Sequence, residues 1–390
     1  MAEDDTPNPF NNPLFAQFQR AMSAQGPLQW DVARQTALMS ATQGAAEHNV
    51  DPQRRIAVES LAAVAQMHVA EITGREIRNL GKLEVVGRAT WVNLTLDAWK
   101  PYFDELARAI SGAPENATAD DDGTDPMMKM LANMSRMIAP SMLGMSVGTL
   151  VGRLAVNTFG QFDLPLPREP HDKLVIVIGN VDNFADEWSI PREDMTMWAL
   201  THELVSSAVF GVDHVRDALR QLVINFAAGF RPNPGALSDG IGQLDVSSGD
   251  PMKILDSLLS DPTVLLGAQR SDAQDRVAPS LDAAVAAIVG YIDHCVDRAS
   301  ARILGEGSRI AEAVRRRRVA QSGDRVFVER LLGIDLTPER VTVAQHFVAG
   351  VLERAGEEGL SQLVTKPGSL PTPAEVVAPG LWLARLEGGN

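Results

Sequence analysis

The stretch that decides the expected fold is MWALTHELVS, residues 197–206. Glu193 and Asp194 precede it, and acidic side chains there complement the positive end of a helix dipole. Gly211 follows the apolar run and marks where that helix ends or bends. The sequence therefore predicts a helix over about 194–210, with a histidine and a glutamate next to each other near its middle.

This helix resembles the zinc-binding helix of metallopeptidases, whose pattern is His-Glu-x-x-His. Two histidines one turn apart bind a single Zn²⁺, and the glutamate takes a proton from the metal-bound water. His202 and Glu203 fill the first two places, but Ser206 stands where the second histidine belongs. A hydroxyl is a poorer Zn²⁺ ligand than imidazole. A third ligand ten residues after the first would fall on Val212, which has no ligand atom.

Other side chains could complete a metal site with His202. His214 follows the predicted helix, and Asp293 and His294 lie on a later one. His294 is the alternative ligand that the sequence offers. Asp293, His294 and Asp297 share one helical face. This arrangement is typical either of a metal triad or of a hydrogen-bonded histidine in the core, and we favour the core histidine.

Composition narrows the class of protein. The 390 residues carry a net charge of -15, which argues against nucleic acid as the partner, because phosphate binding needs a basic surface. A single cysteine, Cys295, excludes internal disulfides and a cysteine-based zinc site, and we expect it in the core. The acidic N-terminus lacks the pattern of a secretory signal, so a cytoplasmic location is expected. Ser206 and Ser207 lack the glycine-flanked nucleophile elbow, and the sequence contains no P-loop.

The expected fold class is mainly α with a small β element around residues 172–182. The run LVIVI, residues 174–178, is the clearest strand, and its continuous apolar character indicates burial on both faces. Further helices are predicted at about 276–303, 306–319, 325–332 and 338–356. We expect the zinc-type helix to pack near the 276–303 helix.

The chain divides into five expected regions. They are a flexible arm (1–27), an N-terminal helical region (28–111), an acidic loop (112–125), a core with the incomplete zinc helix (126–366) and a C-terminal tail (367–390).

Two segments allow more than one interpretation. Residues 127–152 are rich in methionine, with Gly144, Gly148 and Gly152 on one helical face; charges and Pro140 argue against a membrane span. This segment is typical of a buried, hairpin-like helix pair, or of a flexible surface for an apolar ligand. The run Arg315–Arg318 could bind phosphate, RNA or an acidic partner, but a solvated helix face is the favoured interpretation.

Several segments, each of low specificity alone, occur together in a characteristic order. They are Gly26–Asp31, Thr90–Trp99, the helix with Gly144 and Gly148, Asn180–Phe184, Val314–Arg318, Leu332–Leu336 and Leu370–Thr372. With these segments the chain resembles a family of zincin-like bacterial proteins, variously labelled zinc-dependent metalloprotease, hydrolase or coenzyme F420 biosynthesis-associated protein. The resemblance implies a zincin-like, helical metalloprotease-type fold.

The resemblance also implies a set of site residues. The family has His-Glu-x-x-His on the metal helix and a glutamate immediately before a glycine on a later helix. These positions fall on His202, Glu203 and Ser206, and on Val289 before Gly290. One ligand position and the general-base position are therefore kept, and two of three ligand positions are lost. Actinobacterial members of the family often carry substitutions in this helix.

Two functions follow from this departure. The preferred one is a catalytically lapsed zincin, a pseudoenzyme without a bound cofactor that acts as a binding or scaffolding protein for a protein or peptide partner. Glu203 would then be a vestigial general base and His202 a vestigial ligand, both buried and paired. The alternative is a metal-dependent peptidase that holds zinc through His202 and a non-standard ligand such as His294, with Glu203 activating water.

Overall fold

The computed structural model describes residues 26–47, 49–74, 83–111, 126–169, 173–231, 270–304, 307–319, 331–334 and 336–388. The expected acidic loop and nearly all of the expected N-terminal arm lie outside these residues, as does most of the helix predicted at 325–332.

The described chain is mainly helical with one small parallel sheet, which confirms the expected fold class. Its elements are α2 (Trp30–Thr42), α3 (Pro52–Thr73), β1 (Leu83–Val86), α4 (Arg88–Ser111), α5 (Pro126–Asn157), β2 (Leu174–Val177), α6 (Ile178–Glu187), α7 (Arg192–Phe210), α8 (Asp213–Ala228), α12 (Asp272–Ile303), α13 (Gly307–Val319), α15 (Pro338–Thr365), α16 (Pro373–Val377) and α17 (Pro379–Gly388).

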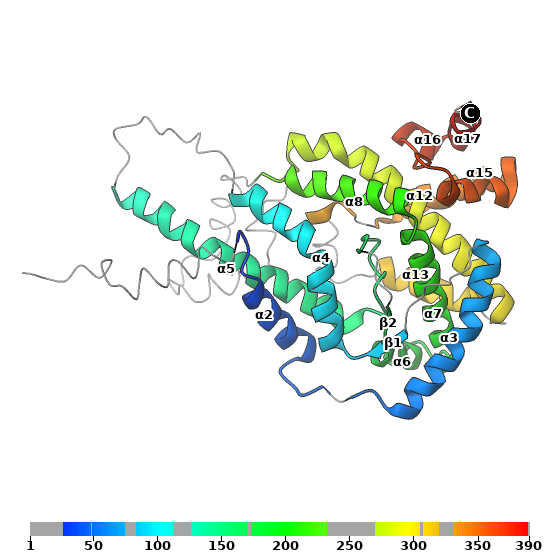
Figure 1. Cartoon of the computed structure of the whole chain (residues 1–390), viewed down its shortest axis with the longest axis horizontal. Coiled ribbons are helices and arrows are strands. Elements are labelled where there is room, and N and C mark those ends of the chain that lie inside the picture. Colours follow the sequence, from blue (N-terminus) through cyan, green and yellow to red (C-terminus); the bar gives the residue numbers. More distant parts are fainter. Residues whose placement is uncertain are drawn as a thin grey trace, which may run out of the picture.

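The sheet lies among the helices and has two strands (Figure 1). The predicted strand is confirmed as β2, which is buried along its whole length. It pairs in parallel with β1, a strand that we did not predict, with Leu83 opposite Leu174. On its other side, Gly160 forms an antiparallel bridge to Ile176. This bridge fixes the loop after α5 beside β2.

The predicted zinc-type helix is confirmed as α7, which runs from Arg192 to Phe210. It packs against α3, α6, α12 and β2, so the expected contact with the 276–303 helix is present. Every residue from 195 to 206 is buried. A helix that is buried on all sides is a central core helix.

Residues 126–157 form one continuous helix, α5, so the expected hairpin-like pair within this segment was wrong. The reason is that α2 supplies the partner. A Cβ added to Gly148 would lie 2.4 Å from the carbonyl oxygen of Ala33, and one added to Gly152 would lie 2.5 Å from that of Ala37. The small residues therefore let the two helix backbones approach closely, as their spacing predicts.

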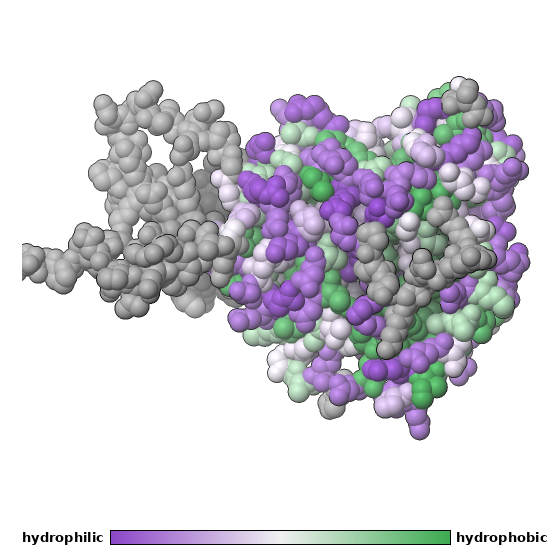
Figure 2. Space-filling model, viewed as in Figure 1, coloured by the Kyte–Doolittle hydropathy of each residue, from purple (hydrophilic) through white to green (hydrophobic). Residues whose placement is uncertain are grey.

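The C-terminal helices lie together at one end of the molecule (Figure 1). Residues 367–390, which we expected to be a tail, contain α16 and α17, and Trp382 on α17 is fully buried. On the face shown in Figure 2, hydrophilic side chains are interspersed with small apolar patches over the described residues. Within the described chain, each helix is too short or too polar to cross a bilayer.

Candidate functional site: an altered zinc-type helix

The carboxylate of Glu203 is enclosed by the loop that follows α5. It accepts a hydrogen bond of 2.7 Å from the backbone N–H of Gln161 and one of 3.2 Å from that of Phe162. Glu203 as a whole is 1% exposed. A Cβ added to Gly160 would lie 2.3 Å from Cδ of this carboxylate, so the loop backbone lies directly against it.

A buried arginine lies at the other end of the same loop. Arg168 is 5% exposed, donates a 3.2 Å hydrogen bond to the Thr95 hydroxyl and lies 5.7 Å from the centre of the Trp99 ring. Burial lowers the pKa of Arg168 to about 10, and the charge of Glu203 opposes that shift. Glu203 is thus a counter-charge for a cation that burial would otherwise destabilise. No sequence motif pointed to Arg168.

His202 lies beside this group and is also buried, with 5% of the residue exposed. Its ring stacks on Trp198, one turn earlier, with 5.4 Å between ring centres. Its Nδ1 lies 3.6 Å from Oε1 of Glu203. Both residues of the His-Glu pair are therefore buried and lie close together in the core.

The second ligand position holds Ser206, which is 1% exposed. Among the residues that the structure describes, its hydroxyl has no hydrogen-bond partner, so it is an uncompensated polar group in the core. The position carried over for the third ligand, Val289 on α12, is also buried and has only an apolar side chain. Its neighbour Gly290 faces α15, where an added Cβ would lie 2.9 Å from the carbonyl oxygen of Ala344. Helix packing therefore accounts for the glycine without a metal.

The alternative ligand, His294, has a different partner. Its Nε2 lies 3.0 Å from Oε1 of Glu357 on α15, and Arg298 pairs with the same carboxylate at 2.7 Å. Five residues separate His294 from Val289, which places their side chains roughly 140° apart around α12. The two positions thus face different directions.

An acidic member of that predicted cluster, Asp297, pairs with Arg315 on α13. Burial raises the pKa of Asp297, and the Arg315 charge opposes this. Among the described residues there is no group of three or more His, Cys, Asp or Glu side chains arranged to hold a metal ion. The residues at the family's ligand positions, one imidazole, one hydroxyl and one apolar chain, do not form a zinc site.

The basic run on α13 is divided among different partners. Arg315 pairs with Asp297, and Arg316 pairs with Glu312 one turn earlier. Arg317 instead turns inward, with its guanidinium 3.8 Å from the centre of the Phe159 ring. The side chain of Arg318 lies outside the described residues. A solvated face therefore accounts for Arg316 but not for Arg317.

The fold and the His202-Glu203 helix define a zincin-like protein. The model of the zincin-like metallopeptidase family matches residues 28–383, and the chain belongs to that family. A crystal structure from Chloroflexus aurantiacus, titled as a "putative hydrolase with a novel fold", has the same fold. It is 21% identical, with a TM-score of 0.62, and the match covers 92% of this chain and 99% of that chain. No protein with curated annotation matches this chain.

Proposed function

We propose that this zincin-like protein has lost metal-dependent catalysis and acts by binding a protein or peptide partner. The observation that carries the proposal is the environment of Glu203. A general base must lie within hydrogen-bond reach of the water whose proton it takes. Both oxygens of this carboxylate instead accept backbone N–H groups, and the residue is 1% exposed.

The ligand positions support the same conclusion. A catalytic zinc site needs three protein ligands, with a fourth position open for water. At the family's positions this chain offers the imidazole of His202, the hydroxyl of Ser206 and the apolar side chain of Val289. One imidazole binds Zn²⁺ too weakly to retain it at the concentrations of free zinc in a cell. The proposal therefore assigns no cofactor to this protein.

The alternative, a peptidase with zinc held by His202 and His294, has less support. His294 would have to leave Glu357, and five residues of α12 turn it away from the direction of Val289. Glu203 would have to give up its hydrogen bonds from two backbone N–H groups. The buried charge of Arg168 would then lack its counter-charge.

Metal analysis of the purified full chain tests the loss of the site. After incubation with zinc and dialysis, we expect far less than one zinc ion per chain, and the same value for His202→Ala and His294→Ala. A zinc content of one ion per chain that falls in His202→Ala would overturn the proposal. Retention in His202→Ala together with loss in His294→Ala would place a metal elsewhere and leave α7 without a catalytic role.

Peptide binding tests the second half of the proposal. A random peptide library is incubated with the full chain, and the peptides that stay bound through gel filtration are analysed by mass spectrometry. We expect a selected set of peptides, recovered intact. Recovery of cleaved peptides, or recovery of the unselected library, contradicts binding without catalysis.

A further inference from the structure

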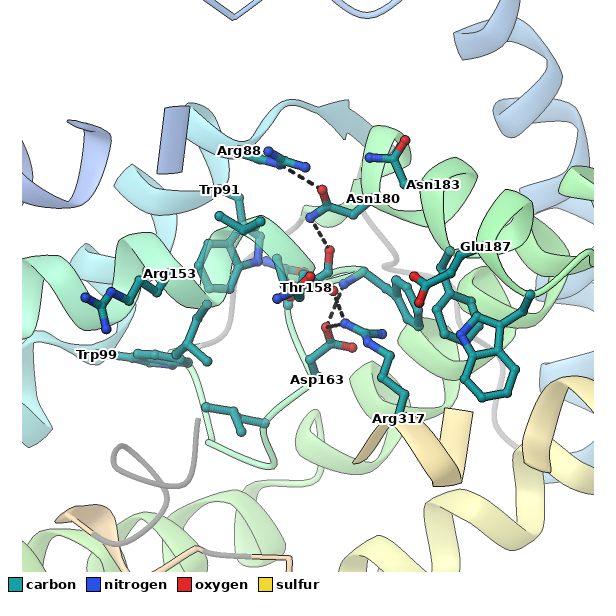
Figure 3. Close-up of a pocket in the computed structure, with 18 residues that line it drawn as sticks. Arg88, Trp91, Trp99, Arg153, Thr158, Asp163, Asn180, Asn183, Glu187 and Arg317 are labelled. Carbon is teal, nitrogen blue, oxygen red and sulfur yellow. Dashed lines mark hydrogen bonds and ion pairs between the residues drawn. The ribbon is translucent and has the colours of Figure 1, made fainter. Parts of the chain in front are cut away.

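A cavity of about 470 Å³ lies on the far side of the loop that encloses Glu203. It lies between α4, the end of α5 with the following loop, α6 and Arg317 of α13 (Figure 3). Gln161 lies between the two environments, because it lines the cavity while its backbone N–H binds Glu203. Glu203 and His202 themselves do not line the cavity.

One wall of this cavity is aromatic. Phe159 and Phe184 meet edge to face at 5.2 Å, and Phe184 stacks on Trp188 at 5.6 Å. The guanidinium of Arg317 covers the same group, 3.8 Å from the centre of the Phe159 ring and 5.4 Å from that of Phe184. Phe159 and Phe184 are 3% and 5% exposed, whereas Trp188 is half-buried, so a flat apolar group placed here would gain burial mainly against Trp188.

The cationic group at the opposite side of the cavity is Arg88. Its Nε donates a 2.8 Å hydrogen bond to Oδ1 of Asn180, and it forms no ion pair with any carboxylate in the described part of the chain. Asn180 is itself held in place, because its Nδ2 donates to the carbonyl oxygens of Ala155 at 2.8 Å and Thr158 at 2.7 Å. Arg88 is thus positioned by a neutral amide and retains four N–H donors and its full charge.

A second donor in the lining lacks an acceptor. Trp99 is 1% exposed, and its indole N–H has no hydrogen-bond partner within the described ranges of the chain. A buried donor without an acceptor costs free energy, which a ligand oxygen would recover. Arg88 and Trp99 therefore both call for a ligand that brings hydrogen-bond acceptors.

The acidic residues of the lining do not supply acceptors to Arg88 or to the Trp99 indole N–H. Asp163 accepts a 2.6 Å hydrogen bond from the backbone N–H of Phe159 and lies 4.0 Å from Arg317. Glu187 is exposed on α6, one turn beyond Asn183. In Figure 3 Glu187 lies near the aromatic wall and away from Arg88, so it would repel a second acidic group at that end.

We propose that this cavity binds a small organic anion with one acidic group and a flat apolar body. Arg88 holds the acidic group, and the body lies at the aromatic wall against Trp188. The anion is selected against a matched neutral molecule because the lining offers a charged, preorganised donor group, the Arg88 guanidinium. This site is separate from the zinc-type helix and does not depend on the proposed loss of catalysis.

Two dyes of matched shape test the proposal on the full chain. One is 8-anilinonaphthalene-1-sulfonate, which carries one anionic group, and the other is N-phenyl-1-naphthylamine, its neutral counterpart. Titration is followed by energy transfer from tryptophan. We expect saturable 1:1 binding of the anion, weakened about tenfold or more in Arg88→Gln and only partly in Arg88→Lys, with binding of the neutral dye unchanged.

The matched control is Arg34→Gln. Arg34 also donates to an asparagine side chain, Asn93, but it lies on α2 outside the cavity. Trp188→Leu should weaken the binding of both dyes, because it removes an aromatic ring from the wall. The proposal is overturned if the anion shows no saturable binding, if it binds no better than the neutral dye, or if Arg34→Gln weakens it as much as Arg88→Gln. Thermal melting of each variant identifies any that fails to fold, and Arg88→Lys then supplies the comparison. Zinc content measured on the same samples keeps this result separate from that of the metal test.

Discussion

The carboxylate of Glu203 accepts a 2.7 Å hydrogen bond from the backbone N–H of Gln161, a residue 42 positions earlier in the chain. This contact joins the central helix α7 to the loop after α5, and β2 fixes the same loop from another side through the bridge between Gly160 and Ile176. The residue that would be the base of a zinc peptidase here supports a loop. Replacing a residue with this structural role should have effects that differ from those of replacing a catalytic residue.

Replacement of this glutamate should cost stability. In Glu203→Gln the new amide N–H₂ faces a backbone donor, and Arg168 loses its buried counter-charge. We expect a decrease in the free energy of unfolding of about 2–4 kcal/mol, measured by urea unfolding at pH 7.

Glu187→Gln is the control, because Glu187 is exposed on α6 and should change stability by less than about 0.5 kcal/mol. A Glu203→Gln variant that is as stable as the wild type would show that the loop does not depend on this carboxylate. Increased stability would point instead to an active site, where function is maintained at the expense of stability.

The space at Gly160 makes a second prediction. Alanine there would place a Cβ 2.3 Å from Cδ of Glu203, in a loop that the bridge to β2 prevents from moving away. We expect Gly160→Ala to lower the free energy of unfolding by about 1–3 kcal/mol in the same urea experiment.

The matched glycine is Gly179 in α6, which has no atom within 4 Å of its added Cβ. Gly179→Ala should be neutral or stabilising by up to about 1 kcal/mol, because alanine reduces the entropy of the unfolded chain. Equal effects of the two substitutions would contradict the close packing of the loop on Glu203.

The secondary structure was predictable where the local pattern was strong. The helix α7 and the strand β2 follow from their apolar runs and flanking acidic and glycine residues. The strand β1 was missed because Leu83–Val86 is only four residues long and becomes a strand through pairing with β2, which lies far along the chain. The glycines of α5 were recognised as a contact face, but the sequence did not identify α2 as the partner.

The candidate site was predictable only in part. The motif located His202 and Glu203, and the resemblance located Ser206 and Val289. The partners of Glu203, by contrast, are backbone N–H groups, and no side-chain pattern marks a residue whose backbone will donate to a distant carboxylate. The cavity was also missed, because Arg88, Phe159 and Arg317 come from three separate segments and only the tertiary fold brings them together.

The lone thiol should be unreactive in the folded chain. Cys295 on α12 is 3% exposed, and burial raises the pKa of its thiol to about 12. The thiolate is the reactive form, and a rise from 9 to about 12 lowers its fraction at pH 8 about a thousandfold. We expect negligible reaction with a disulfide reagent such as Ellman's reagent at pH 8, and one thiol per chain after addition of guanidinium. Rapid reaction of the folded protein would show that α12 opens at this position.

The C-terminal helices should show an acid-dependent stability that depends on Glu375. Burial raises the pKa of this carboxyl, but hydrogen bonds from Arg385 and Thr372 outweigh burial, and the net shift is downward. Arg385 donates to both carboxylate oxygens, at 2.6 and 3.1 Å, and the backbone N–H of Thr372 donates at 2.9 Å.

Because the folded-state pKa of Glu375 lies below its unfolded value, the stabilisation is fully present above the unfolded pKa of about 4.5. It is lost as the pH falls through the folded-state pKa. We expect Glu375→Gln to be less stable than the wild type at pH 7 and to lose less of its stability between pH 5 and pH 3, measured by guanidinium unfolding. Glu353 is the control, since its side chain is 81% exposed and its ion pair with Arg354 is long, at 3.8 Å. Glu353→Gln should follow the wild-type curve, and parallel acid curves for Glu375→Gln and the wild type would show that the contact between Glu375 and Arg385 does not stabilise this end of the chain.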